Sequence, residues 1–146
     1  MQVKPEYEIV DEFPKIAQKL VKKYPEVFLD LDVKSVKCVA VMNKDRKENN
    51  LKVWDMKPVH MPMRMDSPYA YYLIVYMSDW SEMEEKNRAL LIADALLTLP
   101  TTAGEGGPLK SFDLKDFNTM VRTFGVDYLT RQDVPNILEK DVKWVR

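Results

Sequence analysis

The chain is poor in the residues that bind transition metals or form disulfides. It has one histidine, His60, and one cysteine, Cys38, among its 146 residues. Zinc sites usually take three or four ligands, drawn from histidine, cysteine, aspartate and glutamate. An ordinary tight zinc site would therefore have to rely largely on carboxylates, whereas sites with oxygen ligands for hard cations stay open. The single cysteine excludes an internal disulfide, which is typical of a protein in a reducing cytoplasm.

Long apolar runs and an excess of either charge are also absent. No stretch reaches the roughly 18 consecutive apolar residues of a membrane span, and the opening residues MQVKPEYEIV lack the apolar segment of a secretory signal. The 22 lysines and arginines nearly balance the 23 aspartates and glutamates. We therefore expect a single cytoplasmic domain over residues 1–146, with no membrane or nucleic-acid partner.

The spacing of apolar residues predicts most of the regular structure in the first half of the chain. Residues 8–24 have the period of an amphipathic helix that begins near Asp11. Residues 33–42 and 51–59 are predicted to pair as a hairpin, joined by a polar turn. Residues 69–80 are apolar on both faces, which is typical of a central strand.

A buried helix is predicted over about residues 81–98. Ser81 followed by Glu84 has the pattern of a capping box, and residues 89–99 are almost wholly apolar apart from Asp94 and Thr98. Downstream, residues 113–124 favour another helix, and the chain is irregular from about residue 130. The pattern predicts an α+β domain with an N-terminal helix, a small antiparallel sheet of about three strands, a central buried helix and further C-terminal helices.

Three segments together resemble one known family. DWSEMEEKNRALLIADALL (79–97), FDLKDFNTMVRTFGVDYL (112–129) and AQKLVKKYPEVFLDLDVKSVKCVAVM (17–42) are similar, in order, to the putative phage metallopeptidase family, which has a zincin-like fold. That family carries His-Glu-x-x-His on a helix. The two histidines bind one zinc ion, the glutamate is the general base, and a third ligand follows downstream.

The resemblance places the motif on residues that differ from it. The histidine positions fall on Ala93 and Leu97, the third ligand position on Phe112, and the general base on Asp94. Alanine, leucine and phenylalanine side chains cannot bind a metal. The resemblance thus implies a zincin-like pseudo-metallopeptidase that has no cofactor. We expect such a phage-type protein to act by binding another protein, whose identity stays open, in the host machinery or in a host defence system.

The alternative is a hydrolase with a relocated or non-zinc active site. Asp94, Asp113 and Asp116 are the carboxylates that could gather a hard cation. Asp94 itself has two interpretations, as the remnant of the general base or as a structural carboxylate. In the second case it would cap a loop or pair with a basic side chain such as Arg88 or Arg122.

The candidate partner-binding surface is the methionine-rich stretch after residue 55. Methionine is flexible and adapts to irregular partners, which favours a protein-binding role. In the competing interpretation, the loop folds over the core and its methionines fill gaps. The sheet edge and loop 101–111 are expected on the same side. The candidate residues are Met56, His60, Met61, Met63, Met65 and Tyr69.

Two further residues have structural interpretations that we favour. His60 is expected to be an ordinary surface histidine rather than a pH-sensitive contact or a metal ligand. Cys38 lies within the predicted strand 33–42, whose pattern is partly alternating. It is therefore expected to be a small buried apolar residue rather than a reactive thiol.

Overall fold

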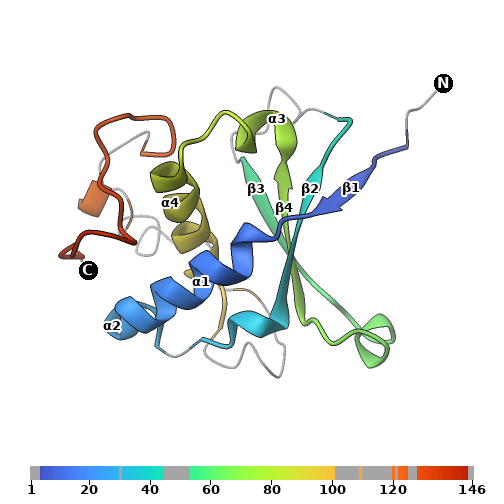
Figure 1. The fold of residues 1–146 in the computed structure, drawn as a ribbon. Helices are drawn as coiled ribbons and strands as arrows, with labels where there is room; N and C mark the ends of the chain where they lie inside the picture. The colour runs from blue at the N-terminus through green and yellow to red at the C-terminus, as the bar shows by residue number, and fades with distance from the viewer. Residues whose placement is uncertain are drawn as a thin grey trace.

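The computed structural model describes residues 4–29, 31–44, 53–100, 109, 120, 122–124 and 128–144. Figure 1 shows a sheet with helices on one side of it. The helices are α1 (Glu12–Lys23), α2 (Pro25–Phe28), α3 (Met77–Trp80) and α4 (Glu85–Leu96). The strands are β1 (Tyr7–Ile9), β2 (Val36–Val41), β3 (Trp54–Pro58) and β4 (Tyr71–Tyr76). Short 3₁₀ turns occupy Val33–Ser35 and Met63–Met65. The predicted α+β class is therefore confirmed.

The sheet is mixed and has the strand order β1-β2-β4-β3. β2 and β4 are parallel, with Val36 opposite Tyr71, whereas β1 and β3 are antiparallel edge strands. The expected three-stranded antiparallel sheet was wrong in this respect, and so was the hairpin of 33–42 with 51–59. Apolar alternation tells which face of a strand is buried, but it does not tell which strand lies beside it. The prediction of 69–80 as a central strand is confirmed for Tyr71–Tyr76.

The core lies between the sheet and two long helices. The inner face of the sheet carries alternate buried residues, among them Cys38, Leu73 and Met56. α1 turns its apolar side, which includes Phe13 and Leu20, toward this core, as the helical spacing predicted. α4 is buried nearly all round and packs against both α1 and β3. Burial on all sides agrees with the apolar run of residues 89–99.

The start of α4 differs from the predicted start near residue 81. Ser81 has helical backbone angles and ends α3, and its amide donates to the carbonyl of Met77 at 2.9 Å. An N-cap residue needs an extended backbone, and Glu84 has it with ψ of 161°. The capping box at Ser81 was therefore wrong. β4 runs directly into the short helix α3, so Ser81 is already part of a helical turn.

The C-terminal segment, residues 128–144, packs against the helices through its backbone carbonyls and one aromatic side chain. The Lys23 ammonium and the Tyr24 hydroxyl both donate to the carbonyls of Ile137 and Lys140. The Trp144 ring makes edge contacts with the rings of Tyr24, Phe28 and Phe124. These contacts tie residues 137–144 to the end of α1. No helix in the described stretches is long and apolar enough to cross a membrane.

Several predictions fall outside the described residues. They are the polar turn after residue 44, the glycine-rich loop 101–111 apart from Leu109, and the helix start with Asp113, Asp116 and Phe112. Residues 122–124 are helical, and residues 128–144 form turns, bends and irregular backbone, in keeping with an irregular tail.

Candidate functional site around Asp94

Asp94 accepts hydrogen bonds from two aromatic side chains that come from distant parts of the chain. Its Oδ2 atom lies 3.2 Å from Nε1 of Trp54 and 2.8 Å from the hydroxyl of Tyr128. Trp54 projects from edge strand β3, Asp94 from α4, and Tyr128 from the C-terminal segment. The carboxylate is only 8% exposed. Asp94 therefore links β3, α4 and the C-terminal segment at one buried position.

Burial alone would make an ionised carboxylate unfavourable at this position, and the two donors oppose that cost. Burial raises the pKa of the Tyr128 hydroxyl far above its ordinary value, and the charge of Asp94 and the hydrogen bond to it raise the pKa further. Tyr128 thus stays protonated at every physiological pH. It is a permanent donor to Asp94, and a hydrogen bond to a charged group is among the stronger kinds.

Tyr128 is fixed at its backbone as well as at its hydroxyl. The side-chain amide of Asn87 donates to the carbonyls of Tyr128 and Arg131, at 3.2 Å and 3.0 Å. Asn87 is buried and precedes Asp94 by seven residues, about two turns of the same helix. α4 therefore holds Tyr128 through two side chains on one side of the helix.

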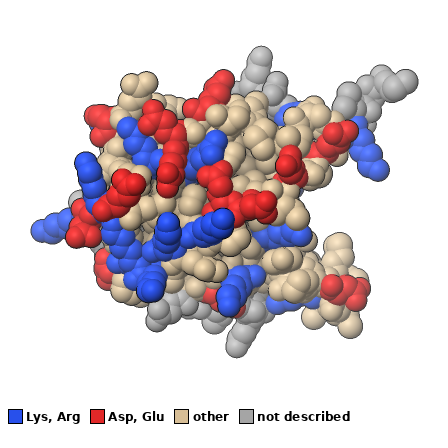
Figure 2. All heavy atoms as spheres, viewed as in Figure 1, with Lys and Arg blue, Asp and Glu red and all other residues tan. Residues whose placement is uncertain are grey.

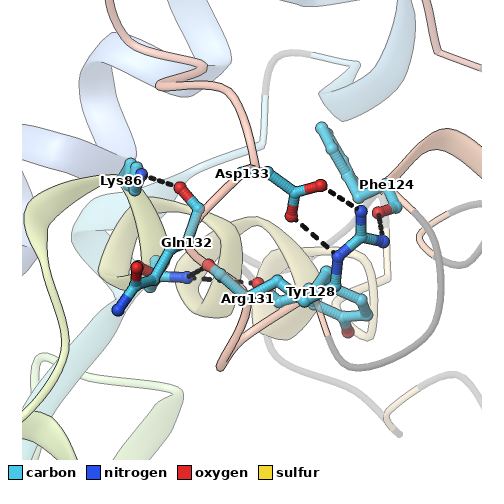
Figure 3. Close-up of polar contacts among 7 residues, drawn as sticks. Lys86, Phe124, Tyr128, Arg131, Gln132 and Asp133 are labelled. Atoms are coloured by element: carbon cyan, nitrogen blue, oxygen red, sulfur yellow. Dashed lines mark hydrogen bonds and ion pairs between the residues drawn. The ribbon is translucent and has the colours of Figure 1, made fainter.

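The segment around Tyr128 is braced by further polar contacts, which Figure 3 shows in close-up. The Lys86 ammonium donates to the carbonyl of Gln132. Arg131 pairs with both carboxylate oxygens of Asp133 and also donates to the carbonyl of Phe124, at 3.1 Å. These contacts order the turn that carries Tyr128, so its hydroxyl reaches Asp94 from a fixed direction.

Arg88 is not the partner of Asp94, contrary to one of the sequence interpretations. Its guanidinium donates to Glu12 at 2.7 Å and lies 4.9 Å from the ring centre of Trp80. Six residues of α-helix separate Arg88 and Asp94 by about 240° around the axis, so they point in different directions. Sequence reasoning missed Trp54 and Tyr128. The only sequence signal for these partners was that tryptophan and tyrosine each combine an apolar ring with one polar donor group, which suits a polar contact beside an apolar helix.

The positions onto which the resemblance maps the metal ligands carry no donor atoms. Ala93 is fully buried in the core, and Leu97 is partly buried against it. Phe112 lies outside the described residues, and a benzyl side chain has no ligand atom in any conformation. These side chains do not fit a zinc ion. Within the described residues, no three His, Cys, Asp or Glu side chains are grouped so that they could hold a metal ion.

The six partner-binding candidates fall into three different places. Met61, Met63 and Met65 are 72%, 67% and 76% exposed, and His60 is exposed beside them. Met56 is only 5% exposed because it faces the core from β3, so its assignment to a binding surface was wrong. Tyr69 is half-buried and packs against Tyr72 and Lys37 instead of the methionines. We call His60 to Met65 the methionine loop from here on.

Cys38 is buried on the inner face of β2, as predicted. Burial raises the pKa of its thiol to about 12, and the charge of Glu12 adds to the effect. A thiol with this pKa is almost entirely protonated at neutral pH, and the thiolate is the reactive form. Cys38 is therefore a packing residue.

The comparison with known proteins supports the family that the motifs suggested. A family model described as putative phage metallopeptidase matches residues 5–142. The chain belongs to this family. The match takes in α4 with Ala93, Asp94 and Leu97, and also the segment that carries Tyr128. No curated protein and no solved structure matches the chain.

Proposed function

We propose that this family member is non-catalytic and uses a zincin-like scaffold to bind another protein. The observation that carries the proposal is the pairing of the Asp94 carboxylate with Trp54 and Tyr128 inside the core. A general base has to reach a water molecule beside the substrate, within hydrogen-bond distance. A carboxylate that is buried and already accepts two protein hydrogen bonds serves the fold instead.

The side chains around Asp94 support the same proposal. Metal-assisted hydrolysis requires ligands that hold the ion and leave one position open for water. Ala93 and Leu97 offer only alkyl groups, and both belong to the packed core. Asp94 is one methylene shorter than the glutamate of the motif. We infer that its role is to fix β3 and the C-terminal segment to α4.

The surface that we propose for partner binding is the methionine loop. Its three methionines are exposed and follow His60 closely in the sequence, and exposed apolar groups in one segment are typical of interaction sites. The loop is internally hydrogen-bonded, with the Arg64 guanidinium donating to the carbonyl of Ser67 at 2.7 Å and the Arg64 amide to the carbonyl of His60 at 3.0 Å. An ordered loop loses less entropy on binding.

We further propose that the partner is a host protein, in the cell's machinery or in a defence system. This step rests on membership of a phage family and on the lack of a fitting metal site among the described residues. A phage protein without catalytic activity can still act by occupying a host surface. The partner is expected in extracts of a bacterial host and not among the phage's structural proteins.

Affinity purification tests the binding role quantitatively. The wild-type chain and the Met61→Ser, Met63→Ser, Met65→Ser triple variant are used to capture host proteins, which are compared by mass spectrometry and then purified for direct titration. We expect the triple variant to lose one captured protein that the wild type retains. Met42→Ser, at another exposed methionine, is the control and should retain it. Equal capture by all three chains would rule the loop out.

A further inference from the structure

Three shallow grooves adjoin one another on the surface of the molecule. The first lies between α1 and residues 31–34, the second between α1 and β2, and the third on the outer face of the sheet. The first two share Gln18 and Lys34, and the last two share Ile9 and Lys37. The shared residues make one continuous surface, which we call the lysine groove.

Three lysines line the lysine groove at successive points along it. Lys22 is in the first groove, Lys34 joins the first to the second, and Lys37 joins the second to the third. Among the residues that the structure describes, none of these lysines is in an ion pair. Of the acidic residues that line the groove, Asp32 accepts a hydrogen bond from the amide of Lys34, and Glu8 lies at the far end. Three lysines against two acidic residues give the lining of the groove a net positive charge.

The same charge separation is visible on the face that α1 crosses. Figure 2 shows lysine and arginine side chains gathered in a belt across the lower half of this face, with most acidic side chains above them. The whole chain has a formal net charge of −1. The basic belt is thus a local feature and not a consequence of overall composition. Such a local field favours a negatively charged partner over a neutral one.

The outer end of the groove is apolar. Ile9, Val39 and Ile74 are aligned across three neighbouring strands by the register of the sheet. Ile9 is 56% exposed, and these residues line the third groove together with Tyr72. The ammonium of Lys37 lies 5.2 Å from the ring centre of Tyr69, which fixes a positive charge between the apolar row and the rest of the groove.

We propose that the lysine groove binds an acidic polypeptide segment that also carries apolar side chains. The lysines match its carboxylates, and the row Ile9, Val39 and Ile74 matches its aliphatic or aromatic groups. A nucleic-acid backbone would meet the lysines but would leave the aliphatic row without a counterpart. The proposal is independent of the methionine loop, because the two surfaces share no residue.

A peptide selection tests the proposal without knowledge of the natural partner. A random peptide library displayed on phage is selected against the full chain, and the enriched peptides are synthesised with a fluorescent label for anisotropy titration. We expect enriched sequences to combine Asp or Glu with apolar residues and to bind more tightly at low salt. Failure to enrich any sequence, or enrichment of sequences without acidic residues, would contradict the proposal.

Charge-reversal variants locate the binding. Lys22→Glu, Lys34→Glu and Lys37→Glu together should weaken the selected peptide about tenfold or more. The matched control reverses three lysines that do not line the groove, Lys15→Glu, Lys19→Glu and Lys143→Glu, and should bind nearly as tightly as wild type. Equal loss in both triple variants would show a nonspecific charge effect and overturn the proposal. Thermal melting of each variant establishes that it is folded.

Further measurements separate other occupants from the peptide and test the independence of the two surfaces. Ile9→Ser should weaken the peptide several-fold, whereas binding of labelled oligothymidylate to a nucleic-acid groove would not require Ile9. Tight oligothymidylate binding that the Lys22, Lys34 and Lys37 reversals abolish would replace the peptide with nucleic acid. A dimer in gel filtration that the same reversals dissociate would identify the occupant as a second copy. Loss of peptide binding in the methionine-loop triple variant would contradict the independence of the two surfaces.

Discussion

The hydroxyl of Tyr128 donates a hydrogen bond to the carboxylate of Asp94 at 2.8 Å, across 34 residues of sequence. This contact fixes the C-terminal segment to α4, the helix onto which we map the metal-binding motif of the family. Trp54 completes the arrangement from the edge strand of the sheet. Asp94 is thereby part of the structure that holds the domain together.

Tyr128→Phe should lower the free energy of unfolding by about 1–3 kcal/mol, because it removes a donor to a buried charge while the ring still fills its place. The measurement is denaturant unfolding monitored by tryptophan fluorescence. Tyr72→Phe, at a half-buried tyrosine of the sheet's outer face, is the matched control and should change stability little. An equally stable Tyr128→Phe would show that the contact does not hold the segment.

Asp94→Leu should destabilise the chain more than Asp94→Asn does. Leucine leaves the donors of Trp54 and Tyr128 without their carboxylate, whereas asparagine keeps an acceptor oxygen. We expect a difference of about 1–2 kcal/mol between the two variants. The opposite order, with leucine the more stable, would mean that an apolar core is preferred at this point and that the carboxylate is retained for another reason.

Stability should fall at high pH in a manner that depends on Tyr128. Its pKa is raised in the folded state above the ordinary value of 10.0. The folded state therefore holds a proton that the unfolded state releases, so the contribution is complete below pH 10 and declines as pH rises above it. The loss of free energy of unfolding above pH 10 should be smaller for Tyr128→Phe than for wild type. Identical pH profiles would contradict this assignment.

Cys38 should resist thiol reagents in the native protein. Its pKa of about 12 leaves almost no thiolate at pH 8, and the side chain is buried. Iodoacetamide labelling followed by mass spectrometry should be slow in buffer and rapid in denaturant. Rapid labelling of the folded chain would show that β2 opens easily or that the thiol is activated, and it would reopen a chemical role for Cys38.

Much of the fold could be predicted because its signals are local. α1 appeared in the sequence as an apolar stripe, and α4 as an apolar run that ends at Pro100. The position of β3 was not predictable in the same way. Its alternation, with Trp54 and Met56 buried, was clear, yet only the packed sheet determines that it lies beside β4 and not β2. For the same reason, Met56 looked like a member of the exposed methionine loop.

Of the residues at the site, Asp94 could be predicted from the sequence, but its two partners could not. A carboxylate in an apolar helix requires hydrogen-bonding or charged partners. The resemblance to the family motif had also singled out Asp94. The partners come from residues 54 and 128, each more than 30 residues away, and no sequence periodicity links them to α4. Arg88 was the obvious local candidate, but helical geometry turns it toward Glu12.

Zinc binding by the purified chain is the decisive measurement for the proposal that this family member is non-catalytic. The protein is treated with chelator, dialysed against a small molar excess of zinc, freed of unbound metal and examined by elemental analysis. Its matched control carries the family motif, with Ala93→His, Asp94→Glu, Leu97→His and Phe112→His. We predict clearly substoichiometric zinc for the natural chain, whether or not the control gains it. One zinc ion per natural chain, accompanied by peptidase activity that the chelator abolishes, would contradict it.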